Sequence, residues 1–169
     1  MNKITQPLRD EHKDLFPHVE LLRLAGDAIG NEPFTPETIH LIEEAEEFLT
    51  HHLIPHAQAE DKALYPVVQK VMGAARATAT MSRDHVEVGT LTSELTDLRK
   101  HALKTAFSAD QAIALRRVLY GLYTLVKVHF AKEEEIYLPL LDERLTVEEG
   151  AAMFKAMEAA AGEAKSHLN

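Results

Sequence analysis

The chain contains no cysteine, which excludes disulfides, thiolate metal ligands and cysteine nucleophiles. Its apolar runs are short and interrupted by charged residues, so no segment is predicted to span a bilayer. The N-terminal stretch lacks the apolar core of a secretory signal. We therefore expect a cytoplasmic protein without a membrane partner.

Positive charge and aromatic side chains are also scarce. The 18 Lys and Arg residues are outnumbered by 27 Asp and Glu residues, which gives a net charge of −9 and argues against a nucleic-acid partner. Only 6% of the 169 residues are aromatic, whereas Ala, Leu and Glu are abundant, a composition that favours helices. This length predicts one domain, covering residues 1–169, with a substantial core.

Apolar residues recur at spacings of three and four, which predicts five helices. Thr35 caps the second helix, Ser108 with Gln111 starts the fourth, and Thr146 with Glu149 starts the fifth. Gly26 is expected to end the first helix. The predicted ranges are about 6–25, 35–72, 80–103, 108–142 and 146–168.

Short connections between the first four helices predict an all-α, up-down-up-down four-helix bundle over about residues 6–142. The fifth helix, at about 146–168, is expected to pack across the outside or the end of this bundle. On the fourth helix, Val126, His129, Glu133 and Ile136 are predicted to face the core. Pro17 and Pro55 lie within helical patterns and are expected to kink them or tighten a turn.

One pattern of polar residues occurs twice, at an offset of 73 residues. In each copy a histidine is followed 44 residues later by His-x3-Glu, in register with the apolar stripe. Such a repeat predicts two helical hairpins related by a pseudo-two-fold axis. The residues are His12, His56 and Glu60 in the first copy, and His85, His129 and Glu133 in the second.

Six inward-facing polar residues are difficult to explain without a cation. A single inward histidine is more often a satisfied core residue, but buried polar groups are costly, and two neighbouring carboxylates repel each other. Histidine and glutamate at positions i and i+4 share one helix face, so both can reach a common centre. Two carboxylates could bridge two metal ions, and this set of nitrogen and oxygen ligands suits iron, manganese or zinc.

The duplicated pattern, with its trailing Tyr-Pro and Leu-Pro, resembles the hemerythrin-like (HHE cation-binding) family over residues 8–141. The resemblance implies a non-haem di-iron centre in which an oxo or hydroxo group bridges two iron ions. It also implies a small diatomic or peroxide ligand. It gives His12, His56, His85 and His129 as terminal ligands, and Glu60 and Glu133 as bridging ligands.

The chain departs from the oxygen-carrying hemerythrins, which have a fifth histidine where this sequence has Gly89. The vacant coordination position is open to water, substrate or another side chain such as His52 or Tyr65. An open position favours sensing, scavenging or storage involving oxygen, peroxide or nitric oxide over simple oxygen carriage. The alternatives are a peroxide-decomposing redox enzyme, and an iron- or zinc-binding protein without turnover.

Other polar residues near the motifs have two interpretations each. Asp61 and Glu134 are expected on the helix surface or as outer partners of the ligands. His18 and His52 should approach each other, as an interhelical pair or as additional metal ligands. Tyr65 and Tyr137 are expected mainly to pack at the end of the site, with a redox role as the alternative. The remaining histidines are predicted to be solvated: His40, His51, His101 and His167.

Overall fold

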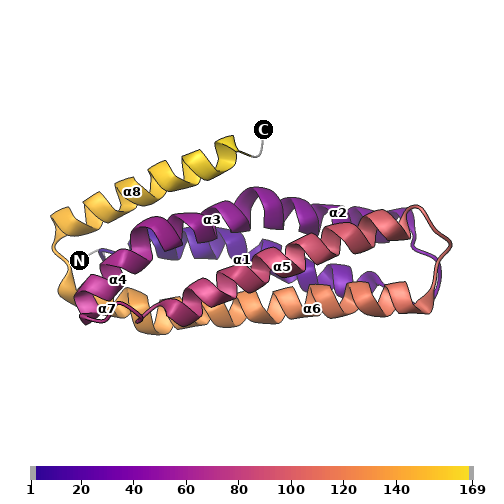
Figure 1. Cartoon of the computed structure of the whole chain (residues 1–169), viewed down its shortest axis with the longest axis horizontal. Coiled ribbons are helices and arrows are strands. Elements are labelled where there is room, and N and C mark those ends of the chain that lie inside the picture. The colour runs from indigo at the N-terminus through magenta and orange to yellow at the C-terminus, as the bar shows by residue number, and fades with distance from the viewer. Residues whose placement is uncertain (1–2, 168–169) are drawn as a thin grey trace.

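In the computed structural model, which describes residues 3–167, four long helical rods form an antiparallel bundle (Figure 1). The rods are α1 (Gln6–Ala28); α2 (Pro36–Phe48) continued through η1 (Leu49–Leu53), α3 (Ile54–Ala59), η2 (Glu60–Leu64) and α4 (Tyr65–Met72); α5 (Ala79–Ala102); and α6 (Ala109–Lys132) continued through η3 (Glu133–Tyr137) and α7 (Leu138–Arg144). A fifth helix, α8 (Val147–Ser166), packs along α3 and η2. The predicted all-α bundle with an added C-terminal helix is confirmed.

The predicted helix starts are present as capping interactions. The Thr35 side chain accepts a hydrogen bond from the Thr38 N–H, and both capping boxes, at Ser108 and at Thr146, are complete. At the other end of the second rod, Gly73 adopts a left-handed φ of 64° and ends α4. Within the described part of the chain, no helix has the length and apolar character needed to cross a membrane.

The predicted break at Gly26 is wrong, because α1 continues to Ala28. Gly26 is buried, and a Cβ atom at this position would lie 2.8 Å from the Cε1 atom of Tyr120 on α6. Its missing side chain therefore allows α1 and α6 to approach closely.

Three π-helical segments accommodate prolines inside the rods. A proline has no N–H and clashes with the carbonyl four residues before it, so it disfavours a regular α-turn, although α1 continues as an α-helix through Pro17. In the three π-helical segments the residue before each proline bonds instead to the carbonyl five residues back, which widens the turn. The bonds run from Ile54 to Leu49, before Pro55; from Tyr65 to Glu60, before Pro66; and from Leu138 to Glu133, before Pro139.

The wide turns also change which side chains face inward. A strict α-period places Ile136 toward the core, but its side chain is 57% exposed, and Tyr137 is buried in its place. The prediction for Ile136 is wrong because η3 shifts the helical phase after Glu133.

Two apolar clusters fill the core, and the polar residues of the repeated motif lie between them. Along α1, for example, His12 lies between Leu8 of one cluster and Leu15 of the other. The cluster that contains Leu8 also includes Met153 and Met157 of α8. The C-terminal helix thus completes the core at one end of the bundle.

Candidate metal centre

Six polar side chains from all four rods converge at the middle of the bundle. His12 comes from α1, His85 from α5, and the remaining residues come in two pairs, each a histidine followed by the glutamate that opens η2 or η3. Glu60 and Glu133 are completely buried. The structure therefore brings together all six residues that the sequence analysis singled out.

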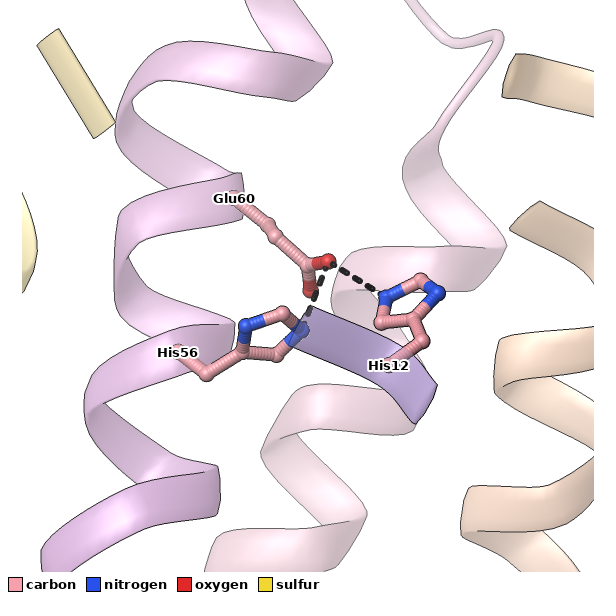
Figure 2. A group of neighbouring side chains, drawn as sticks. All are labelled: His12, His56 and Glu60. Atoms are coloured by element: carbon pink, nitrogen blue, oxygen red, sulfur yellow. Dashed lines mark ion pairs between the residues drawn. The ribbon is translucent and has the colours of Figure 1, made fainter. Parts of the chain in front are cut away.

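The first hairpin contributes one half of this cluster. The Nε2 atom of His56 lies 3.0 Å from Oε1 of Glu60, and Nε2 of His12 lies 3.8 Å from the same oxygen. Figure 2 shows both imidazoles pointing toward the Glu60 carboxylate. His12 Nε2 is also 3.4 Å from Oε2 of Glu133, so the second hairpin reaches into this half.

The second hairpin contributes the other half. The Nε2 atoms of His85 and His129 are 3.0 Å apart, and they lie 3.2 and 3.8 Å, respectively, from Oε2 of Glu60. Oε1 of Glu133 is 3.5 Å from His129 Nε2. Each carboxylate therefore directs one oxygen to each half.

Tyr65 also reaches the cluster, although sequence reasoning favoured a packing role for it. Its hydroxyl donates a hydrogen bond of 2.8 Å to Oε1 of Glu133. The hydroxyl oxygen lies 3.3 Å from Nε2 of His129 and 3.4 Å from Nε2 of His85. No tyrosine appears at the equivalent position of the repeat, which is Leu138.

Most of the atoms directed at the centre have no hydrogen-bond partner. These atoms are His12 Nε2, His56 Nε2, both carboxylate oxygens of Glu60, and Glu133 Oε2. Several of them lie within 4 Å of one another, but no hydrogen bond joins them. Burying such atoms without partners is costly, and a bound cation would satisfy them.

The arrangement fits a metal ion. Two groups of three side chains have possible ligand atoms that all lie within 4.8 Å of one another: His12 with His56 and Glu60, and Glu60 with His85 and His129. Glu60 belongs to both groups, as a bridging carboxylate would. Imidazole and carboxylate donors are compatible with iron, manganese and zinc.

A second set of carboxylates orients the four imidazoles. An ionised carboxylate only accepts hydrogen bonds, so each Nδ1–H donates and each Nε2 is directed toward the centre. Asp61 and Glu134 are thus confirmed as outer partners, whereas Glu11 and Asp84 were missed. A sequence signal for them existed, since an acidic residue precedes the first histidine of each copy. The distances are 2.9 Å for His12–Glu134, 3.0 Å for His56–Glu11, 2.8 Å for His85–Asp61 and 3.0 Å for His129–Asp84.

The electrostatics of the cluster favour positive charge. Burial lowers the pKa of His129, but the adjacent carboxylates of Glu133 and Glu60 outweigh this effect and raise the pKa to about 10. Burial raises the pKa of Glu60, but His56 and the other imidazoles hold it well below its usual value. For Tyr65, burial and the charges of the two glutamates raise the pKa, so the phenol stays protonated without a cation. A site that attracts protons to Nε2 in this way also attracts metal cations.

The remaining histidines lie outside the cluster. The rings of His18 and His52 are nearly parallel with centroids 6.4 Å apart, which confirms that they approach each other. Both are exposed, and neither joins a group of three possible ligands among the described residues, which favours the interhelical pair over a further metal site. The four histidines predicted to be solvated are exposed: His40, His51, His101 and His167.

Comparison with known families agrees with this geometry. The sequence model described as the hemerythrin HHE cation binding domain matches residues 3–141. The chain belongs to this family. The match covers nearly all of the bundle and every His and Glu residue of the cluster. The C-terminal helix α8 begins after the matched region. No curated protein and no solved structure matches the chain.

A small cavity adjoins the cluster inside the HHE domain. It has a volume of about 10 Å³ and is closed by apolar side chains that include Leu53, Val88, Val126 and Phe130. His56, Glu60, His85 and His129 also line it. A space of this size holds roughly one water-sized molecule.

Proposed function

We propose that this protein binds two iron ions in a non-haem centre of hemerythrin type, with His12, His56, Glu60, His85, His129 and Glu133 as ligands. The observation that carries the proposal is the convergence of partnerless buried Nε2 and carboxylate atoms from three of the four rods, beside the Nε2 atom of His85 from the remaining rod. Glu60 supports a pair of ions over a single one, because its two oxygens face different halves of the cluster.

The surrounding residues have distinct tasks in such a centre. The outer carboxylates fix the Nδ1–H tautomer of each histidine, which leaves the Nε2 lone pair free for a metal and makes it more basic. Glu60 and Glu133 supply negative charge that offsets the cations in a buried place. Bound iron would supply a redox-active Lewis acid that interacts with a small oxidant.

The cavity restricts what that small ligand can be. Its volume of about 10 Å³ is that of roughly one water-sized molecule, which favours a very small ligand such as oxygen, peroxide or nitric oxide over an organic substrate of several heavy atoms. The apolar wall formed by Val88, Val126 and Phe130 suits uncharged diatomic molecules. Both properties support a role in sensing, scavenging or storing such a ligand.

The test is metal analysis after anaerobic reconstitution with ferrous iron. We expect about two irons per chain and an optical spectrum that changes when oxygen, peroxide or nitric oxide is added. Protein that retains one iron or none under these conditions would contradict the paired centre. Repeated peroxide consumption by the iron-loaded protein would assign the enzymatic alternative, and retention of zinc alone would assign a redox-inactive site.

A further inference from the structure

We propose that Tyr65 is a seventh protein ligand, which binds the metal ion of the His85–His129 half through its phenolate oxygen. The inference rests on the proposed di-iron function and adds to it a ligand that the repeated His/Glu motif does not contain. It makes the two halves of the centre chemically different.

Distances between donor atoms carry this proposal. Ligand atoms that bind one ion at about 2.0–2.2 Å lie roughly 3.0–3.5 Å from their neighbours around it. The Tyr65 oxygen is 3.3 Å from His129 Nε2 and 3.4 Å from His85 Nε2, and these two nitrogens are 3.0 Å apart. The phenol oxygen therefore lies where a ligand of the same ion would lie.

The π-helical turn η2 is what directs Tyr65 to this position. In a regular α-helix, a residue five positions after Glu60 would be turned about 140° away from it. Here the Tyr65 N–H bonds to the Glu60 carbonyl, so both side chains lie on the inner face of the same wide turn. Pro66 follows immediately and cannot supply the N–H that a regular α-turn would need at this point.

The other half of the centre has no equivalent residue. The repeat places Leu138 where Tyr65 would be, and the nearby Tyr137 donates its hydroxyl hydrogen bond to the Ala77 carbonyl. Gly89, one turn after His85, offers no side chain, and a Cβ atom added there would meet nothing within 4 Å. Tyr65 thus occupies the coordination position left vacant in the His85–His129 half.

Burial of Tyr65 is consistent with a ligand. Its side chain is 1% exposed, and the hydrogen-bond partners of its hydroxyl are Glu133, His85 and His129. On coordination the phenol O–H bond breaks, an oxygen–metal bond forms, and the proton passes to solvent. Oε1 of Glu133, which accepts the phenol hydrogen bond without metal, is then released to bind an ion itself.

The experiment compares wild type with Tyr65→Phe and with Tyr137→Phe as a matched control. Each protein is loaded anaerobically with ferrous iron, its iron is counted, and it is then oxidised with ferricyanide and desalted. We expect wild type and Tyr137→Phe to show a visible phenolate-to-iron charge-transfer band with tyrosinate modes in resonance Raman spectra. Tyr65→Phe should lack the band while retaining at least one iron.

The iron content distinguishes failure of the Tyr65 assignment from failure of the di-iron proposal. Wild type that holds two irons without tyrosinate modes would overturn the Tyr65 assignment and leave the di-iron proposal intact. Wild type that holds no iron would overturn both. If Tyr65→Phe does not fold, wild type and Tyr137→Phe labelled with ring-deuterated tyrosine decide the question, because only the modes of an iron-bound phenolate are resonance-enhanced, and these should shift on labelling in both proteins.

Discussion

Glu60 is the residue that links the two halves of the centre. Both of its oxygens lack hydrogen-bond partners, and it belongs to both groups of possible ligands, whereas Glu133 belongs to neither group. Loss of Glu60 should therefore affect both ions, and loss of Glu133 should be less severe.

We predict that Glu60→Ala removes most of the iron, that Glu133→Ala retains more, and that the exposed His18→Ala retains the wild-type amount. Iron content after anaerobic reconstitution measures this order. An equal loss in His18→Ala would show that residues outside the cluster contribute to binding.

The outer carboxylates should matter nearly as much as the ligands. Asp84 accepts a hydrogen bond from His129 Nδ1 and also pairs with Lys132. Asp84→Ala is expected to weaken iron affinity by about 10–100-fold, because the imidazole loses its orientation and part of its basicity. Competition with a chelator measures the affinity, and Asp97→Ala, an exposed change on the same helix, should leave it unaltered.

At the scale of single elements, α8 stabilises the end of the bundle next to the centre. Met157 of α8 is 5% exposed and belongs to the same apolar cluster as Ala59 and Ala63, which flank Glu60. The helix that covers this cluster begins after the region matched by the family. Its packing should therefore contribute to the stability of the metal site.

We predict that Met157→Ala lowers the free energy of unfolding of the metal-free protein by about 2–5 kcal/mol, the usual cost of emptying a buried site. Met72 is 47% exposed at the end of α4, so Met72→Ala should change the same quantity by no more than about 0.5 kcal/mol. Urea denaturation followed by circular dichroism gives both values. Equal effects of the two substitutions would mean that α8 does not pack as described.

At the scale of the whole molecule, a buried polar layer divides the core into two apolar clusters. Four imidazoles and two carboxylates in this layer are costly without cations, and metal that binds only the folded state offsets the cost by mass action. The metal-free protein should therefore melt at a lower temperature than the iron-loaded protein. The difference should shrink in Glu60→Gln/Glu133→Gln, which buries no glutamate charge. Calorimetry with and without chelator measures it, and identical melting temperatures would refute a stabilising metal.

Much of this structure was predictable because its causes are local and repeated. Helix starts at Thr35, Ser108 and Thr146 depend on side chains a few residues away, and these interactions are present. The six cluster residues were identifiable because the same spacing occurs twice, in phase with the apolar stripe. Both features could be recognised without knowing how the helices are placed in space.

Other features were decided only by the tertiary structure, because they depend on the helical phase and on contacts between rods. The π-turns, which form where prolines interrupt regular hydrogen bonding, turn Tyr65 into the cluster and Ile136 out to solvent. Gly26 ends no helix because its role is to make room for Tyr120 of another rod. The pairing of Glu11 with His56 likewise joins residues 45 positions apart. The sequence by itself determined which groups lie near the centre, whereas the packing of the rods determined how they face one another, because that packing fixes distances that spacing along one helix does not.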